Sequence, residues 1–407
     1  MTRSPSPAIP AARRGLIVLF AVACGVGAAN LYLAQPLVTV IGDSLDISEP
    51  AAGLVATLAQ FGYATGIILL APLGDVVQPR RLVTVLLLAA AGCLVVAAAA
   101  PGLPVLLAAS FAAAACTVVP QILIPLATRL TPPDRAGHTV ATLAAGLYLG
   151  LFGSRVLGGL LGEAAGWRAV YLGAAVATAT TALLLRPALP GTRPPAGHAA
   201  SYGALLAGLP RLLRERPVLR QACALQFCWF SVFIAAWAVI VLRLTGPAFD
   251  WSTAAAGLSG LVGLAAGALT PLAGPLAERY GGTTVIGAGL GLAVTAVALL
   301  AAAGGTIVGL AVGMFALTLG IQLAQSVNQA RVLGEAATDR SSANTVFVGA
   351  TFLGGSFGAA VGQAAYDSAG WAGFATFAAT MICLAALRFA LATGRPRAPL
   401  PGARARH

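Results

Sequence analysis

Long apolar stretches alternate with short polar or Pro/Gly-rich breaks along almost the whole chain. A bilayer core requires about 20 consecutive apolar residues for each helix that crosses it. Stretches of this length occupy residues 15–41, 51–73, 82–100, 103–127, 139–162, 169–189, 218–242, 253–277, 284–303, 306–332, 344–365 and 372–392. The pattern therefore predicts an all-α integral membrane protein with twelve transmembrane helices.

The longest break, residues 186–220, divides the predicted spans into two sets of six. It begins with several prolines and ends in an arginine-rich stretch that contains Arg211, Arg214, Arg216 and Arg220. Residues 202–213 mix apolar and basic side chains, which is typical of a helix that lies on a membrane surface. The predicted organisation is a cytoplasmic tail over 1–14, a six-helix bundle over 15–189, a cytoplasmic linker over 190–217, a second six-helix bundle over 218–392 and a cytoplasmic tail over 393–407.

Composition excludes most other classes of protein. Apolar residues make up 58% of the chain and charged residues only 9%, whereas about a quarter of the residues of a soluble protein are charged. The six cysteines lie inside apolar stretches without the spacing of metal ligands. We therefore expect neither a soluble enzyme nor a metal site, and no cofactor.

The net charge of +12 is the difference between 24 basic residues, all of them arginine, and 12 acidic residues. If the N-terminus is cytoplasmic, the inner loops and tails hold 21 of the 24 arginines, Arg168 and Arg243 lie outside, and Arg155 falls within a span. Arginines are retained on the cytoplasmic side of membranes. The charge thus predicts a multi-pass protein of the cell membrane with both termini cytoplasmic, and it does not indicate a nucleic-acid partner.

The two predicted bundles repeat each other at an offset of 203 to 205 residues. Pro-Leu-Gly-Asp at 72–75 corresponds to Pro-Leu-Ala-Glu at 275–278, and Asp-Arg at 134–135 corresponds to Asp-Arg at 339–340. The glycines at 150, 158 and 166 correspond to those at 354, 362 and 370. Parallel six-helix repeats are the plan of a large class of transporters, with a midplane site between the halves. The repeat predicts two pseudo-symmetric bundles and transport of a small molecule.

In these features the chain resembles the major facilitator superfamily. Residues 71–81, Ala-Pro-Leu-Gly-Asp-Val-Val-Gln-Pro-Arg-Arg, resemble the family's loop motif Gly-x-Leu-Ala-Asp-Arg-x-Gly-Arg-Arg between the second and third spans, and residues 274–281 form a second copy. The resemblance covers residues 15–392. Residues 30–37 and 60–63 are similar to a bacterial branch of drug or small-metabolite exporters. The resemblance implies the major facilitator fold and secondary active transport by alternating access.

The resemblance also implies a cytoplasmic gate at the loop motif. Asp75 would pair with Arg80, Arg81 or Arg129, and with the start of span eleven near Ser341, and so lock the cytoplasmic side in the outward-open state. Glu278 and Arg279 hold corresponding positions in the second copy. The alternative for Asp75 is an ordinary solvated loop acid.

Span five contains the glycines Gly146, Gly150, Gly158 and Gly159, which would let another helix approach closely. Drug/proton antiporters resemble one another here through Gly-Pro-x-x-Gly-Gly, whereas this chain has Arg155 at the proline position. An ionisable residue inside a membrane is a functional-site hypothesis, so we expect Arg155 to face the cavity and bind an anionic or polar group. The alternatives are that Arg155 extends to the outer interface or pairs with Glu163.

In this superfamily spans one, four, seven and ten line the central cavity, and here they carry several amides and aromatic residues. Our candidate cavity residues are Asn30, Tyr32, Gln35, Gln121, Tyr148, Arg155, Gln226, Trp229, Gln322, Gln325 and Asn328. Amides are costly in lipid unless they are hydrogen-bonded. Each one should therefore face the cavity or join two helices.

We expect a carrier and not an enzyme, moving a small organic molecule across the inner membrane by proton-coupled efflux. Uptake of a nutrient or metabolite by symport or uniport is the alternative within transport. A membrane receptor or membrane-embedded enzyme is less favoured, because the spans carry no paired carboxylates and no metal cluster. No acid falls inside a predicted span, so proton coupling follows from the resemblance alone. The expected partners are the substrate, protons and membrane lipid, and the expected state is a monomer.

Overall fold

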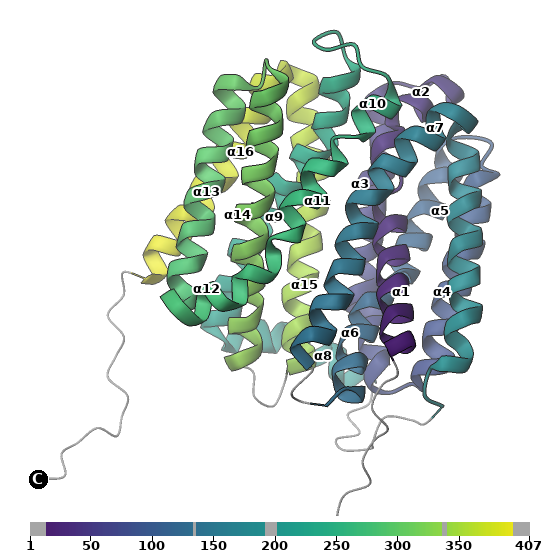
Figure 1. Cartoon of the computed structure of the whole chain (residues 1–407), viewed down its shortest axis with the longest axis vertical. Helices are drawn as coiled ribbons and strands as arrows, with labels where there is room; N and C mark the ends of the chain where they lie inside the picture. The colour runs from purple at the N-terminus through teal and green to yellow at the C-terminus, as the bar shows by residue number, and fades with distance from the viewer. Residues whose placement is uncertain (1–13, 133–135, 192–201, 336–339, 394–407) are drawn as a thin grey trace, which may run out of the picture.

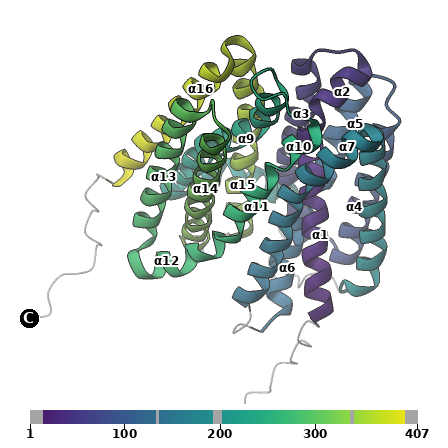
Figure 2. The same ribbon diagram turned by 45° about the horizontal axis from the view of Figure 1, so that its top comes forward.

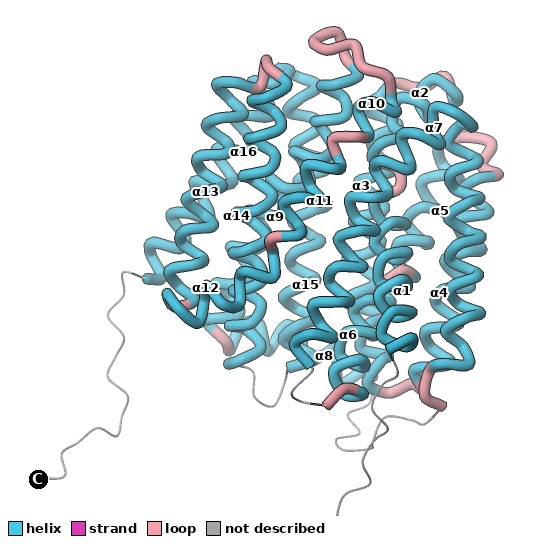
Figure 3. Tube along the Cα trace, in the orientation of Figure 1, coloured by secondary structure: helices cyan, strands magenta, loops and turns pink. Residues whose placement is uncertain are grey.

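The computed structural model describes residues 14–132, 136–191, 202–335 and 340–393. Within these ranges every regular element is a helix (Figures 1 and 3). The predicted all-α class is confirmed. Both tails, the middle of the linker (192–201) and the residues Asp134, Arg135 and Asp339 of the repeat lie outside the described residues.

The N-terminal and C-terminal halves form two bundles that stand side by side (Figure 2). The first consists of α1 (Arg14–Tyr32), η1 (Gln35–Leu37), α2 (Val38–Leu45), α3 (Glu49–Leu69), η2 (Ala71–Asp75), α4 (Pro79–Ala98), α5 (Leu103–Cys116), α6 (Val119–Leu130) and α7 (Ala136–Ala188). After α8 (Tyr202–Glu215), the second consists of α9 (Pro217–Thr245), α10 (Thr253–Gly257), α11 (Gly260–Ala268), η4 (Thr270–Leu272), α12 (Ala273–Tyr280), α13 (Gly282–Ala303), α14 (Ile307–Glu335), α15 (Arg340–Phe357), η5 (Gly358–Gly362) and α16 (Gln363–Thr393).

Ten segments of the described chain are long and apolar enough to cross a bilayer, and two of them, His138–Ala188 and Arg340–Leu391, have 51 and 52 residues. The first of these reverses direction at Gly166, whose φ of 79° and ψ of 161° are not helical. Gly25 of α1 packs against Gly150, while Asn30 of the same helix bonds Thr178. A straight helix would separate Gly150 from Thr178 by about 40 Å, so α7 is two antiparallel helices.

The second long segment reverses at Ala369 and Gly370, which also have non-helical backbone angles. The rings of Phe357 and Phe377 are 6.2 Å apart, although a straight helix would place these residues about 30 Å apart. With both long segments counted as two, the helical segments match the twelve predicted spans in number. How many of them cross a bilayer stays a prediction.

Three of the predicted spans are interrupted helices, which is a correction to the sequence-based spans. The interruptions lie at Pro36 in η1, at Pro120 in the first turn of α6 and at Pro271 in η4. Proline has no N–H to donate and clashes with the preceding helical turn. The freed backbone lies inside the bundle, where Pro120 and Pro271 line a cavity.

Helix α7 makes backbone contacts with both halves of the molecule through its glycines. A Cβ atom at Gly146 or Gly150 would meet the carbonyl oxygen of Ala21 or Gly25 in α1. Farther along α7, a Cβ at Gly159 would lie 2.7 Å from the carbonyl oxygen of Thr253 in the C-terminal half. Such contacts are possible only with small residues. The four glycines singled out in span five, the fourth being Gly158 against Pro36, all lie at close contacts.

The halves meet along α3, which packs against α15 and the start of α16. Gly53 of α3 packs against Gln363 of α16, and Gly349 of α15 packs against Ile68 of α3. In Figure 1, α2 and α10 lie at the upper end of the molecule, and α8 and α12 lie at the lower end. Tyr202 of α8 donates a hydrogen bond of 2.6 Å to the carbonyl oxygen of Leu69 at this lower end. The predicted surface segment 202–213 is therefore helical, and its location on a membrane stays a prediction.

The substitution Gly150→Ala should lower the unfolding temperature of the purified protein. The added methyl group meets the Gly25 carbonyl, and overpacking of this kind costs about 1–3 kcal/mol. Gly153→Ala on the same helix is the matched control, because a Cβ there has no neighbour within 4 Å. Thermal unfolding in detergent, followed by tryptophan fluorescence, measures both. Equal unfolding temperatures for the two variants would contradict the close contact.

Candidate functional site

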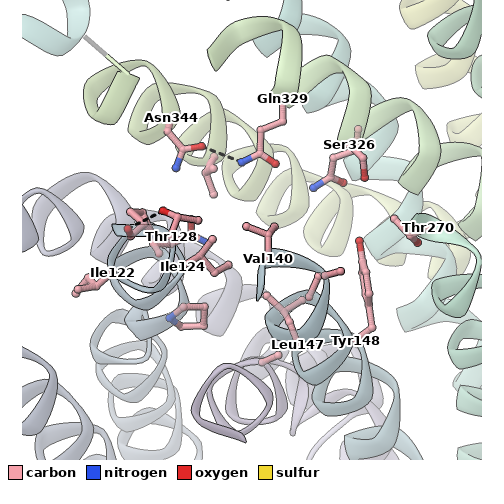
Figure 4. A pocket seen from close by; sticks show the side chains of 18 of the residues that line it. Ile122, Ile124, Thr128, Val140, Leu147, Tyr148, Thr270, Ser326, Gln329 and Asn344 are labelled. Atoms are coloured by element: carbon pink, nitrogen blue, oxygen red, sulfur yellow. Dashed lines mark hydrogen bonds between the residues drawn. The ribbon is translucent and has the colours of Figure 1, made fainter. Parts of the chain in front are cut away.

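A cavity of about 1900 Å³ lies between the two bundles and is lined by residues from both (Figure 4). It extends to Asp75, Arg129 and Arg340 at the lower end of the molecule, where the Arg129 side chain is 59% exposed. At the upper end Phe152, Arg155 and Trp237 are fully buried. The cavity is therefore open at the lower end and closed at the upper end.

Aromatic rings surround the closed end of the cavity. They are contributed by Tyr32, Tyr63, Tyr148, Phe230, Phe233 and Phe352. The ring of Phe352 lies 4.4 Å from that of Tyr63 and 5.3 Å from that of Phe230, which joins the N-terminal and C-terminal walls. Faces and edges of such rings favour contact with other aromatic groups. This part of the cavity suits a flat, apolar ligand.

Four glutamines form the polar part of the lining: Gln121, Gln322, Gln325 and Gln329. Gln121 donates a long hydrogen bond of 3.5 Å to the Tyr63 hydroxyl across the N-terminal wall. Gln329 donates one of 2.8 Å to Asn344 (Figure 4), and Gln322 accepts one of 3.0 Å from Thr270. The cavity therefore offers uncharged hydrogen-bonding groups next to aromatic surface.

The charged side chains of the described lining all lie at the mouth. They are Asp75, Arg129 and Arg340, and the body of the cavity is neutral. Among the described residues no three His, Cys, Asp or Glu side chains come together as a set of metal ligands. An ion in the body of the cavity would thus meet amides and rings and no opposite charge.

Six of the eleven predicted cavity residues do not line the cavity. Asn30 donates to Thr178, Gln226 accepts from Trp229, and Asn328 donates to the carbonyl oxygen of Ala222. The Asn30 bond joins α1 to the second part of α7, and the Asn328 bond joins α14 to α9. The Gln226 bond lies within α9 and joins neighbouring turns. The sequence-based assignment of Asn30, Gln226, Trp229 and Asn328 to the cavity is corrected here: each makes a hydrogen bond within the bundles and none lines the cavity.

Arg155 and Gln35 are the other two predicted cavity residues that do not line the cavity. The expected cavity position of Arg155 is the second correction. Its side chain is 0% exposed, and its Nη2 donates to Gln35 Oε1 at 2.5 Å while its Nη1 donates to the Leu151 carbonyl at 2.6 Å. The guanidinium carbon lies 5.1 Å from the Tyr32 ring centre, 5.5 Å from that of Phe152 and 4.7 Å from that of Trp237. Arg155 is thus enclosed behind the closed end of the cavity.

Neither alternative for Arg155 describes its position. It does not extend to the outer interface, since its side chain is fully buried. It does not pair with Glu163, which instead accepts a hydrogen bond of 2.7 Å from the backbone N–H of Ala254. A buried cation is satisfied by acceptors and ring faces when no carboxylate is near, and the aromatic residues around Arg155 supply those faces.

The loop motif lies where the halves meet at the mouth. Asp75 accepts a hydrogen bond of 2.5 Å from the Ser341 hydroxyl at the start of α15, and lies 3.8 Å from Arg129. Arg80 and Arg81 are exposed in the first turn of α4. In the second copy, Glu278 and Arg279 are exposed on α12, and Arg279 lies 5.2 Å from the Tyr280 ring centre.

Sequence reasoning missed several lining residues, among them Thr270, Asn344, Phe230, Phe233 and Phe352. The cavity position of the phenylalanines could not be predicted, because an apolar residue in a membrane helix is equally suited to face lipid, another helix or a cavity. Thr270 could have been found, since the Thr-Pro pair at 270–271 interrupts an apolar stretch.

Comparison with known proteins agrees with this architecture. The family model described as Major Facilitator Superfamily matches residues 16–332. A probable transporter of Streptomyces coelicolor is 39% identical over 388 residues, covering 94% of this chain and 89% of that protein. A more distant relative, 28% identical over 305 residues (68% of this chain, 71% of the relative), is a chloramphenicol efflux pump of Mycobacterium tuberculosis.

Solved structures share the fold at low sequence identity. A bacterial homologue of the human lysosomal transporter Spinster, in an inward-facing and unoccupied conformation, superposes with a TM-score of 0.71 at 15% identity. The superposition covers 95% of this chain and 98% of that one. With its paired helical bundles and the cavity between them, the chain belongs to the major facilitator superfamily.

Proposed function

We propose that the protein exports a small, uncharged aromatic molecule from the cytoplasm by alternating access. The observation that carries this proposal is the neutral cavity of aromatic rings and amides, which is open at one end and closed at the other. Binding sites for small molecules are mostly apolar, with a few polar groups that fix the ligand's orientation. The name of the distant relative, a chloramphenicol efflux pump, supports export of this kind of compound.

The position of Arg155 changes the class of substrate that the sequence suggested. A cavity arginine would have favoured a weakly anionic compound, but the guanidinium is enclosed away from the cavity lining. Without that cation, an anion in the body of the cavity would lose its hydration and meet no opposite charge, which is costly. An uncharged compound loses much less on entering.

The arginine distribution supports an orientation in which the lower end of the molecule faces the cytoplasm. With that orientation the structure corresponds to an inward-open state of a carrier in the cell membrane, and the mouth at Asp75 and Arg129 is the cytoplasmic entrance. Proton coupling is part of the proposal on the strength of the family resemblance, and Asp75 is the acid among the described lining residues.

Arg155 then acts as part of the closure on the outer side. Its neighbours Gln35, Tyr32 and Phe152 belong to the N-terminal half, whereas Trp237 belongs to the C-terminal half. Opening the outer side would separate Trp237 from the guanidinium and let water reach it. The cation–π contact across the halves therefore stabilises the outward-closed state, by about 0.5–2 kcal/mol for a contact of this type.

Transport of radiolabelled chloramphenicol into inside-out membrane vesicles tests the proposed function. We expect uptake that depends on the protein and increases with an imposed pH gradient, acid inside, and little uptake of benzoate, an aromatic anion. Right-side-out vesicles show whether the movement is export. Benzoate transport in preference to chloramphenicol and other uncharged aromatic compounds would contradict the proposed substrate class, and protein-dependent accumulation in right-side-out vesicles would indicate uptake.

Both Arg155→Ala and Arg155→Lys should open the outer side more often. A lysine cannot donate to Gln35 and Leu151 while it stacks on three rings, because its charge is a single point on a flexible stem. Labelling of a cysteine at Thr39, which faces Thr253 of the other half at 3.4 Å, should rise about tenfold, as a loss of ~1.4 kcal/mol predicts. The labelling is done from outside in a background without the native cysteines.

The control is Arg168→Lys, since Arg168 also stacks on a tryptophan, at 4.2 Å from the Trp167 ring centre, but lies within the N-terminal half. This variant should leave the labelling unchanged. If Arg155→Ala has wild-type labelling and wild-type transport, Arg155 is only a packing residue and the proposed closure is wrong.

The variant Asp75→Asn should slow turnover, because it weakens the contact that joins the loop motif to α15 at the cytoplasmic end and lets this end open further. The substitution keeps the shape but removes the charge that accepts from Ser341 and faces Arg129. Because the pair is partly exposed, we expect an effect of about 1 kcal/mol or less, seen as up to a fivefold loss in transport rate and faster labelling of a cysteine at Ala145 in the cavity wall. Ser341→Ala should act in the same direction.

Glu278→Gln is the matched comparison, because Glu278 holds the repeat-related position and is exposed on α12. It should change both readouts less than Asp75→Asn does. Wild-type turnover together with wild-type labelling of the Ala145 cysteine in Asp75→Asn would exclude a gating role for Asp75.

A further inference from the structure

Gln322 lines the cavity and has one polar atom paired and the other buried without a partner among the described residues. The residue lies on α14, lines the cavity and is 4% exposed. Its Oε1 accepts a hydrogen bond of 3.0 Å from the Thr270 hydroxyl. Its Nε2 is buried and has no hydrogen-bond partner among the described residues.

In the structure the Oε1 edge of the Gln322 amide faces the Thr270 hydroxyl. A hydroxyl that donates to Oε1 holds the oxygen towards η4, and so the Nε2 edge is the one left for another partner. A buried donor without a partner is unfavourable. That penalty disappears when a ligand presents an acceptor atom to Nε2, so the site discriminates between ligands with and without an acceptor.

The other amides of the lining are in a different situation. The amide nitrogen of Gln121 already donates to Tyr63, and that of Gln329 already donates to Asn344. Gln325 is half-buried, so water can reach it. Gln322 therefore combines burial with an unpaired donor, which none of these three residues does.

Aromatic and apolar surface lies next to this donor. Tyr148 extends from α7 towards the part of the cavity where Thr270 lies (Figure 4), and a Cβ at Gly267 would come within 3.5 Å of the Tyr148 Cβ and ring. Ile321, beside Gln322 in the chain, also lines the cavity. In such surroundings, with few competing water molecules, a hydrogen bond to a neutral acceptor is stronger than in water.

We propose that Gln322 Nε2 is the specificity-determining donor of the cavity, binding a carbonyl, nitro or ether oxygen on an uncharged aromatic substrate. Thr270 is a positioning residue that orients the amide. The inference rests on the proposed function for the location and class of the ligand, and it adds the functional group that the ligand must carry.

Benzophenone and diphenylmethane are matched probes for this inference. Both carry two phenyl rings, and they differ in the carbonyl oxygen that replaces two hydrogens. We expect wild-type protein in lipid nanodiscs to bind radiolabelled benzophenone about two- to twelvefold more tightly than diphenylmethane, the range that one net hydrogen bond provides. Empty nanodiscs give the background from partition into lipid.

The variant Gln322→Met keeps the length of the side chain and removes the donor. It should bind the two probes with equal affinity, and binding of diphenylmethane above the background of empty nanodiscs shows that the cavity is intact. Thr270→Val frees the amide to rotate and should reduce the preference for benzophenone. Gln363→Met is the control and should keep the full preference, because Gln363 also has a buried Nε2 without a partner among the described residues but does not line the cavity.

The outcomes separate this inference from the function on which it rests. If neither probe binds wild-type protein above the background of empty nanodiscs, the proposed class of uncharged aromatic substrates is wrong. If both bind wild type equally, or if the preference for benzophenone persists in Gln322→Met, the cavity takes aromatic compounds but Gln322 does not select them, and the inference is overturned.

Discussion

The backbone contacts of α7 are the constraint on which the rest of the structure depends. In a bilayer no hydrophobic effect drives helices together, so association relies on close van der Waals contact at small residues. Gly146 and Gly150 bring α7 against α1, and Gly159 brings its next turns against α10 of the other half. A larger side chain at these glycines would separate the helices. The same helix therefore holds the N-terminal bundle together and joins it to the C-terminal bundle at the closed end.

This close approach explains how Arg155 is tolerated. The turn of α7 between the two sets of contacts carries Arg155, and the neighbouring helices supply Gln35, Tyr32 and Trp237 around it. An unpaired arginine facing lipid would cost about 2.5–3.5 kcal/mol on insertion scales. Enclosure by acceptors and by ring faces from both halves lowers that cost while the outer side is closed. The free energy of holding Arg155 in the membrane therefore depends on the conformation of the carrier.

The cavity separates charge from binding surface. The charged side chains of the described lining lie at the mouth, where water solvates them, whereas the body is built from rings and amides, several of which hydrogen-bond within the wall. A neutral body lowers the cost of desolvating an uncharged ligand and leaves selectivity to shape and to unpaired donors or acceptors. The proline interruptions at Pro120 and Pro271 contribute, because they expose backbone and re-aim side chains such as Thr270 towards the interior.

The sequence alone determined the membrane class, the division into halves, the family resemblance and the glycine contacts of α7, because span length, arginine distribution and repeated motifs are properties of the chain itself. Only the tertiary structure decided which polar residues face the cavity. Membrane helices are apolar around most of their circumference, so sequence periodicity did not separate Gln322, which lines the cavity, from Asn328, which bonds the Ala222 carbonyl. The same ambiguity explains why the sequence misplaced Arg155. An arginine in a membrane helix can be stabilised by water in a cavity or by acceptors and rings that enclose it. Which of the two applies depends on Trp237, which approaches Arg155 only when the two bundles pack together.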